Sequence, residues 1–382
     1  MILYIEPIDT LFFRDSRPFE AGIDTFAEST LPSPLALYGA IGNCILKKNK
    51  TDVQDFLGGK VEDPILGRYC EHLQNTKLRI KGVFLCREDE EDEIYLPSPA
   101  NLFLTNSQGN WVAQPSLNTE FKWDIESLDL KPLVLPEEKC KPTPGYVSLE
   151  EMRKRFLRGE RLDLIDVIKS DRLLLHEQRV GHRIARDTSV VEEGFLYSAA
   201  HIRFREELNG KCYGKLRILV AVQNLDNLSL DDIVYLGGER KKAKLSSEDR
   251  DLDLWDEHIL SEIKSGRFFL YLLTPAIFNE GWCKKSWPDE FDGAKLVGAA
   301  VNKPVYLSGW KRSTASGGIP RPIKKAVPEG SVYFFETEGW DDERFERLYG
   351  AYNFNKSLSD EYPCAGFGTS LIGSWKEDKN DS

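Results

Sequence analysis

The sequence lacks the cysteine and histidine spacings that hold structural metals. Its seven cysteines are widely scattered with no Cys-x-x-Cys pair, and the chain has only five histidines. Neither residue type clusters at the spacing of a zinc site, so we predict no metal. An odd number of cysteines without a signal peptide further predicts reduced thiols in a cytoplasm.

Long apolar runs are also missing. No stretch approaches the roughly 20 apolar residues that cross a bilayer. The N-terminus has no basic lead-in, and Glu6 and Asp9 interrupt its apolar start, so it does not resemble a secretory signal. These features predict a cytoplasmic protein with no membrane partner.

Positive charge is in short supply. The chain has 51 Lys and Arg against 62 Asp and Glu, a formal net charge of −11. Because phosphate contacts need concentrated Lys and Arg, this balance argues against a protein that binds free nucleic acid indiscriminately. It is compatible with a local basic groove in an acidic subunit of a larger assembly.

Nucleotide-binding loops are absent as well. The sequence has no Walker motif, and Gly366-x-Gly368 lacks the third glycine of a dinucleotide fingerprint and precedes a predicted strand. We therefore predict no cofactor. Two interpretations of this glycine pair stay open: a close backbone approach to a phosphate or a neighbouring chain, or a tight turn into the last strand.

What the sequence does contain begins with a strand, a long polar loop and a helix. Residues 2–5 form a β-prone run, and Ser33 with Pro34 marks a helix start. The charged, phenylalanine-rich loop between them can present Arg14 and Arg17 to a partner. The alternative is a local salt-bridged turn around Asp15.

At 382 residues and 41% hydrophobic content, the chain is long enough for two domains. The clearest strand of the second half spans residues 215–222. We predict that it opens a second domain after a turn near Asn209-Gly210. Gly237-Gly238, in the strand and turn predicted over 231–240, gives the backbone the freedom to adopt a positive φ.

Two basic regions lie between these strands. Residues 149–171 have helical spacing and hold the densest basic cluster, which predicts either an RNA-backbone contact or a solvated face paired with Glu150, Glu151 and Glu160. The segment 176–204 gathers His176, His182 and His201 among arginines. Histidines in such company are typical of a general base, although spacing alone does not define one.

Six segments in order resemble the family of third subunits of the Cmr complex, the type III-B CRISPR RNA-guided effector, within the RAMP superfamily. They are EPID through FRDSRPF at 6–19, GHRI through GFLY at 181–197, LGGER at 236–240, LTPAIFNEGW at 273–282, AVPEGSVY at 326–333, and GFG through LIGSW at 366–375. The resemblance covers nearly the whole chain.

This resemblance implies an α+β fold with two ferredoxin-like (RRM-type) RAMP domains, residues 1–208 and 209–382. Each would be an antiparallel sheet with helices on one face and irregular insertions. It also implies a non-catalytic subunit that grips the 5′ tag of the guide RNA. Its partners would be the large polymerase-like subunit and the first backbone RAMP subunit. The residues predicted to contact RNA are Arg14, Arg17, His182, Arg183, Arg240, Gly366 and Gly368.

Two alternatives remain from the sequence. Some RAMP relatives cleave guide-RNA precursors, so a metal-independent endoribonuclease using His182 or His201 is one. The other is a purely architectural protein that contacts only protein.

Overall fold

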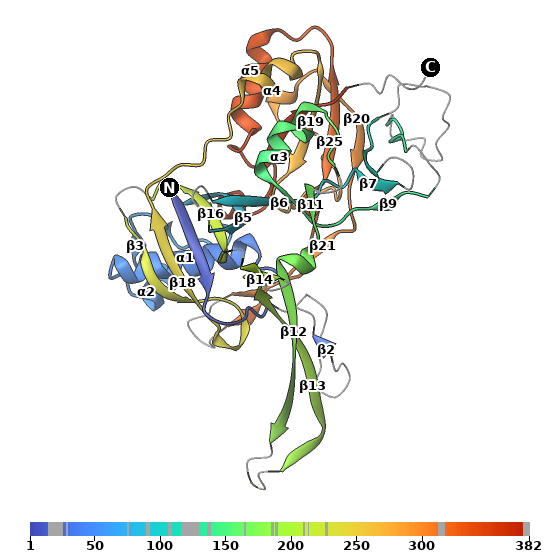
Figure 1. Cartoon of the computed structure of the whole chain (residues 1–382). Helices are drawn as coiled ribbons and strands as arrows, with labels where there is room; N and C mark the ends of the chain where they lie inside the picture. The colour runs from blue at the N-terminus through green and yellow to red at the C-terminus, as the bar shows by residue number, and fades with distance from the viewer. Residues whose placement is uncertain are drawn as a thin grey trace.

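The computed structural model describes residues 1–13, 26–27, 30–74, 76–88, 92–105, 109–115, 130–135, 139–163, 166–184, 187, 190–208, 211–212, 214–225, 228–311 and 318–376. Two sheets form the body, and a long two-stranded arm extends from it (Figure 1). The fold is a mixed α/β structure of antiparallel sheets with few helices. At this coarse level it agrees with the predicted α+β fold class.

The first sheet has eight strands and holds the N-terminal strand near its centre. Its spatial order is β11 (Val167–Ile168), β10 (Tyr146–Ser148), β6 (Glu93–Pro97), β5 (Arg79–Arg87), β16 (Leu216–Gln223), β1 (Ile2–Pro7), β18 (Lys242–Glu248) and β17 (Asp231–Tyr235). All of these neighbouring strands pair antiparallel. Among the described strands, β1 therefore pairs only with strands that come more than 200 residues later.

Residues 2–5 of strand β1 are apolar because both faces of this sheet are covered there. Leu3 and Ile5 belong to the apolar cluster that includes helix α1 (Pro34–Lys48). Ile2 and Tyr4, which point the other way, belong to the cluster that includes the second sheet. Successive side chains of a strand alternate between faces, so a strand between two apolar layers has no polar face.

Helix α1 begins where the sequence predicted. The hydroxyl oxygen of Ser33 accepts a hydrogen bond from the Ala36 amide at 3.3 Å, and Pro34 occupies the first turn. The buried residues Leu37, Ile41 and Ile45 recur at helical spacing along one face. The helix thus covers the first sheet and leaves its opposite face outward. The short helix α2 (Val53–Leu57) follows it, capped by Asp52.

The second sheet has four antiparallel strands in the order β20 (Ala294–Ala300), β25 (Val332–Thr337), β19 (Arg267–Leu272) and β26 (Ser370–Ser374). Helices α4 (Glu257–Ile263) and α5 (Asp342–Tyr352) pack against it (Figure 1). Aromatic rings fill its core: Phe268 stacks on Phe335 at 5.1 Å between ring centroids. The indole of Trp375 donates to the Phe335 carbonyl at 3.0 Å.

The division between sheets differs from the predicted domain boundary. The strand expected to open a second domain is β16, and it lies between β5 and β1 in the first sheet. The second sheet starts only at β19. Conversely, the 3-10 helix η1 (Phe156–Arg158), which follows α3 (Leu149–Lys154), packs against the second sheet, with the Phe156 ring 4.9 Å from that of Phe269.

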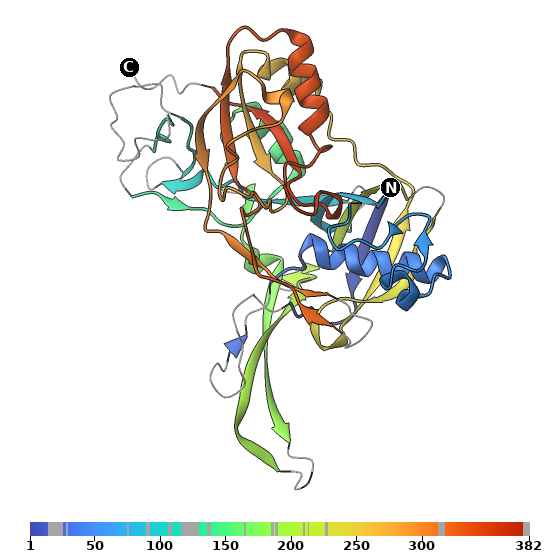
Figure 2. The ribbon, with the colours of Figure 1, turned by 180° about the vertical axis from the view of Figure 1, so that it is seen from behind.

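The arm consists of β12 (Leu174–Ile184) and β13 (Val191–Phe204), a long antiparallel hairpin with a register shift between His182 and Ile184. The short strand β2 (Phe26–Ala27) pairs parallel with β13. Both views show the arm reaching away from the body (Figures 1 and 2).

Small elements complete the structure. They are β3 (Glu62–Asp63), β4 (Gly67–Arg68), β7 (Leu102–Thr105), β8 (Gly109–Val112), β9 (Lys141–Pro142), β14 (Glu207–Leu208), β15 (Lys211–Cys212), β21 (Val305–Leu307), β22 (Trp310–Lys311), β23 (Ile319–Pro320), β24 (Lys324–Ala326), and the 3-10 helices η3 (Ser170–Arg172), η4 (Gly238–Arg240), η5 (Asp289–Phe291) and η6 (Pro363–Ala365). Figure 2 shows the ribbon of β21–β24 running from the second sheet toward α1.

Candidate functional site

The first feature of the site is the base of the predicted arginine loop. The Thr30 amide donates to the Phe13 carbonyl at 3.0 Å, so both ends of the segment 14–29 lie together. Just before them, Leu11 and Ile202 exchange backbone hydrogen bonds of 2.8 and 2.9 Å, which tie the loop to the foot of the arm. Arg14 and Arg17 themselves lie outside the described residues.

A glycine turn fixes this loop base in place. The Gly238 amide donates to the Phe12 carbonyl at 2.7 Å. Gly237 has a φ of +92°, and a Cβ there would lie 2.7 Å from the same carbonyl oxygen, so only glycine fits. The predicted backbone freedom of Gly237 is thus confirmed. We call Phe12, Phe13 and residues 237–240 the loop junction.

Arg240 lies at the loop junction. Its side chain is exposed, and its guanidinium lies 5.5 Å from the centroid of the Tyr235 ring, within reach of a cation–π interaction. The backbone φ of Arg240 is +53°, a conformation that non-glycine residues rarely adopt. Such strained positions cluster at functional sites.

His201, one of the two histidines considered as a base, is buried beneath the loop junction. Its Nδ1 lies 3.0 Å from the Thr10 hydroxyl, and its ring stacks on Phe12 at 4.6 Å between centroids. Its Nε2 lies 3.6 Å from a carboxylate oxygen of Glu239. Burial lowers the pKa of His201, although the Glu239 carboxylate acts in the opposite direction. A side chain only 1% exposed supports packing here more than proton transfer to an outside substrate.

An ion-pair cluster holds the foot of the arm. Asp9, next to the end of β1, accepts from Arg179 at 3.2 Å and Arg203 at 3.1 Å, and Lys241 lies 3.5 Å away. Glu177 pairs with both arginines at 2.8 Å. Burial raises the pKa of Asp9, but the Arg179 hydrogen bond, the Thr10 amide and the neighbouring cations outweigh it and set the pKa to about 2.

His182 and Arg183 lie farther along the arm. Both belong to β12, and the His182 side chain is exposed. Glu177 pairs across the hairpin with His201, and His182 follows it by five residues. At about 3.4 Å per residue, this separates the two histidines by about 17 Å along the arm. His182 and His201 therefore do not converge on one site.

Gly366 and Gly368 lie in close contact with other parts of the chain. Both are buried with positive φ values of +91° and +67°. A Cβ on Gly366 would lie 2.6 Å from Cγ2 of Ile80, and one on Gly368 would lie 2.3 Å from the Ser359 amide nitrogen. The close approach that these glycines permit is made to protein, so the tight-turn interpretation accounts for them.

The basic cluster near residue 155 is also explained within the chain. The predicted long helix ends at Lys154, because the chain turns through η1 to Gly159 at a φ of +72°. Lys154 pairs with Glu150, and Arg155 pairs with Asp163 at 2.5 Å. Carboxylate partners of this kind favour the solvated, salt-bridged face over an RNA contact.

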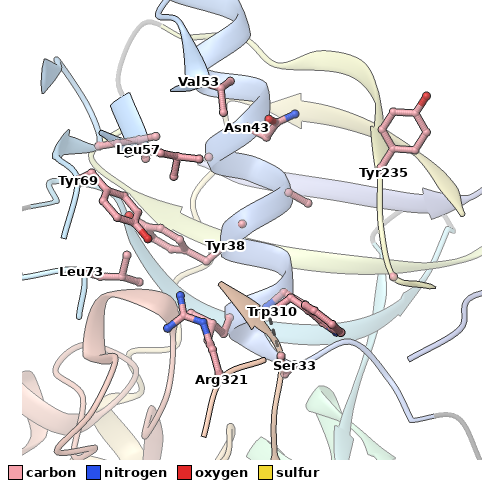
Figure 3. A pocket seen from close by; sticks show the side chains of 18 of the residues that line it. Ser33, Tyr38, Asn43, Val53, Leu57, Tyr69, Leu73, Tyr235, Trp310 and Arg321 are labelled. Atoms are coloured by element: carbon pink, nitrogen blue, oxygen red, sulfur yellow. Dashed lines mark hydrogen bonds between the residues drawn. The ribbon is translucent and has the colours of Figure 1, made fainter. Parts of the chain in front are cut away.

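Sequence reasoning missed a large groove beside the loop junction. This cavity of about 1020 Å³ lies over the outward face of α1 (Figure 3). Its walls include Tyr235 and the loop junction, α2, and the β22–β23 ribbon with Trp310. A signal that could have found it is Gly39, a glycine in the middle of an otherwise well-formed helix.

The described residues contain neither a metal-binding cluster nor a membrane-spanning helix. Across the described residues, His, Cys, Asp and Glu form no group of three or more that could hold a metal ion. None of the helices described here combines the length and apolar character needed to cross a bilayer.

The fold of this chain is similar to that of chains in solved structures. The chain is similar to a chain in the cryo-EM structure of the type III-B Cmr-beta complex bound to cognate target RNA and AMPPnP, with a TM-score of 0.50 and 18% identity. The match covers 87% of this chain and 86% of that one. A second structure of Cmr-beta bound to cognate target RNA gives the same TM-score at 19% identity and the same coverage.

Sequence comparison then gives the family. The family described as CRISPR-associated protein (Cas_Cmr3) matches residues 3–375, so the chain belongs to this family. The CRISPR system CMR subunit Cmr3 of Saccharolobus solfataricus is 24% identical over 258 residues, which is 65% of this chain. The match spans 64% of the length of that relative. The resemblance predicted from the six segments is confirmed.

Proposed function

We propose that this chain is a non-catalytic subunit of a type III-B RNA-guided effector that helps hold the 5′ tag of the guide RNA. The observation that carries the proposal is the loop junction. It brings the start of the arginine loop, the exposed Arg240 and the foot of the arm to one place, although they are far apart in sequence.

The distribution of charges supports an RNA contact that is confined to a small part of the surface. At the foot of the arm the cations Arg179 and Arg203 are paired with Asp9 and Glu177, whereas Arg240 has an exposed guanidinium beside an aromatic ring. Arg14, Arg17 and Arg183 would add phosphate contacts that do not read sequence. His182 on the exposed arm would be a further contact. The net charge of −11 predicts weak binding by the isolated chain and a strong dependence on salt.

The alternative of a metal-independent endoribonuclease has less support. A cleavage site needs a base and a group that stabilises the transition state within reach of one phosphate. His201 is buried and His182 is about 17 Å farther along the arm. Replacing both histidines by Ala should therefore leave guide-RNA maturation unchanged.

We also propose that each sheet is built on a ferredoxin-like unit, as the resemblance implied. Counted along the chain, the set β5-β16-β1-β18 and the set β20-β25-β19-β26 both have the spatial order second, third, first, fourth. This is the strand order of a βαββαβ unit. α1 forms the first crossover of one set and α5 the second crossover of the other; among the described residues, the remaining crossovers carry no α-helix.

Docking to the large polymerase-like subunit and to the first backbone subunit completes the proposal. It rests on the family and on the fold shared with a chain of the Cmr-beta complex. The purely architectural alternative predicts that Arg14→Glu with Arg17→Glu disturbs assembly and leaves RNA contacts intact.

Photo-crosslinking tests the proposal directly. The chain is co-expressed with its neighbouring subunits and a guide RNA that carries one photoreactive base in the 5′ tag, and crosslinked peptides are mapped. We expect peptides from 10–35, 176–205 and 237–242. Arg240→Glu should lower the yield several-fold, whereas Arg347→Glu, on an exposed part of α5, should not. Crosslinks confined to other subunits would leave this chain as a scaffold.

A further inference from the structure

The outward face of α1 contains a glycine for which the described residues give no steric reason. Gly39 lies mid-helix and is exposed, and within 4 Å of a Cβ built there no neighbouring atom of the described chain is found. Glycine at such a position destabilises a helix by about 0.5–1 kcal/mol relative to Ala. The in-chain glycines Gly237 and Gly366 have visible steric reasons; Gly39 has none.

Small residues surround Gly39 on the floor of the groove. Ala36, Gly39, Ala40 and Asn43 follow at i, i+3, i+4 and i+7, so they lie on one face of α1, and all four line the cavity. The lining runs from Leu35 to Leu46, which is about 16 Å of helix. A floor of small side chains lets a second helix approach closely, and this length matches about three turns.

The groove walls are aromatic and uncovered. Trp310 is 72% exposed and Tyr235 is 55% exposed, and they lie on separate segments that both border the cavity (Figure 3). Exposed Trp and Tyr beside a concave apolar surface are typical of binding hot spots.

The charge of the lining differs from that of the chain. Among the described residues that line the cavity, none is Asp or Glu, although the chain has 62 of them. Arg68 and Arg321 are its charged members. Arg321 already lies 3.6 Å from Glu71, whereas the Arg68 guanidinium donates to the Gly59 carbonyl at 3.1 Å. A carboxylate from outside can therefore complement Arg68.

We infer that this groove is the docking site of an amphipathic helix from a partner protein, with its apolar face on Gly39 and a carboxylate at Arg68. The described lining has only two arginines on an apolar floor, a low density of cations for an RNA backbone, and this favours protein over nucleic acid. The mode is helix-in-groove recognition. The inference rests on the proposed function, because the partner would be another subunit of the same effector assembly.

A crosslinker placed at Ile323, on the wall of the groove, tests the inference in the full complex. The chain carrying p-benzoylphenylalanine in place of Ile323, whose side chain is 54% exposed, is co-expressed with the other subunits and guide RNA, purified as the assembly, irradiated and mapped by mass spectrometry. We expect a crosslink to a helical segment of another subunit with an apolar face and a flanking Asp or Glu. The matched control carries the same group at Glu343, exposed on α5.

Crosslinks from position 323 to guide RNA, to this chain alone, or at no more than the control level would overturn the inference. Two variants give a second test. Trp310→Ala and Arg68→Gln, without the crosslinker, should each lower the retention of the partner subunit in the purified assembly by about tenfold, which corresponds to a change of 1.4 kcal/mol in binding free energy. Retention equal to the unmodified chain for both variants would also overturn it. The tag-RNA crosslinks at 237–242 are read in the same samples, so failure of the groove and failure of the RNA contact are distinguishable.

Discussion

Replacing Gly39 by Ala should stabilise the isolated chain. The backbone of α1 is helical at this position, and the described surroundings leave at least 4 Å of open space around the added methyl group. No contact is lost, and the unfolded chain loses backbone freedom. The expected gain in the free energy of unfolding is therefore about 0.5–1 kcal/mol.

Urea unfolding of the isolated chain, followed by circular dichroism, measures this gain as a higher midpoint at an unchanged slope. The Gly39→Ala variant should at the same time bind its partner less tightly in the assembly, because the methyl group occupies the closest point of approach. This combination of higher stability and weaker docking is typical of a functional position.

A lower midpoint for Gly39→Ala would refute the reasoning, because it would mean that the glycine has a role within the chain. Higher stability with unchanged docking would instead separate the helix argument from the groove argument. The comparison variant Gly42→Ala places its methyl group 3.5 Å from Leu66 on the same helix, an ordinary contact distance. It controls for glycine replacement in α1 as such.

Three further predictions follow from the site. Gly366→Ala should lower the free energy of unfolding by at least about 1–3 kcal/mol in the same urea assay, because its Cβ would overlap Ile80 at a positive φ; an unchanged midpoint would contradict this packing. Asp9→Asn should speed hydrogen exchange at the foot of the arm at low salt, and the difference from the unmodified chain should shrink in 1 M salt, where ion pairs are screened. The folded-state pKa of His201 lies below its ordinary value of 6.5, so as the pH falls the imidazole is protonated in the unfolded chain before it is protonated in the folded chain. The free energy of unfolding should therefore fall as pH drops through about 6.5, and His201→Gln should flatten that dependence; equal slopes for both proteins would contradict it.

Local signals in the sequence predicted local structure well. The Ser33-Pro34 pair marks the start of α1 because a cap and a fixed φ act within one turn. The strand predicted over 215–222 is observed as β16, because an apolar run is also a local property of the sequence. Which sheet a strand joins is not a local property: β16 pairs with β1 and β5, and its sequence does not specify those partners. The predicted boundary at 208/209 stays a prediction, while the second sheet begins later in the chain, at β19.

The site could be predicted in part. Gly237 was correctly interpreted because a Gly-Gly pair after a strand indicates an unusual turn. Gly366 also belongs to a glycine-rich segment of the sequence. Only the structure shows that a Cβ on Gly366 would meet Ile80, so that the close approach is to protein. The groove was missed because α1, Tyr235 and Trp310 meet only in three dimensions. A mid-helix glycine was the one sequence signal that pointed toward it.

The central place of β1 has a consequence for synthesis on the ribosome. Its partners β16 and β18 end at Gln223 and Glu248, so the first strand must wait for about 240 residues to emerge. At about 5–20 residues per second, this delay is about 12–50 s. During that time a strand with two open edges and two apolar faces has no sheet to join. In nascent chains that stall before residue 216, chaperones would need to protect β1. Fast translation of the first 250 codons would shorten the time for which β1 is exposed.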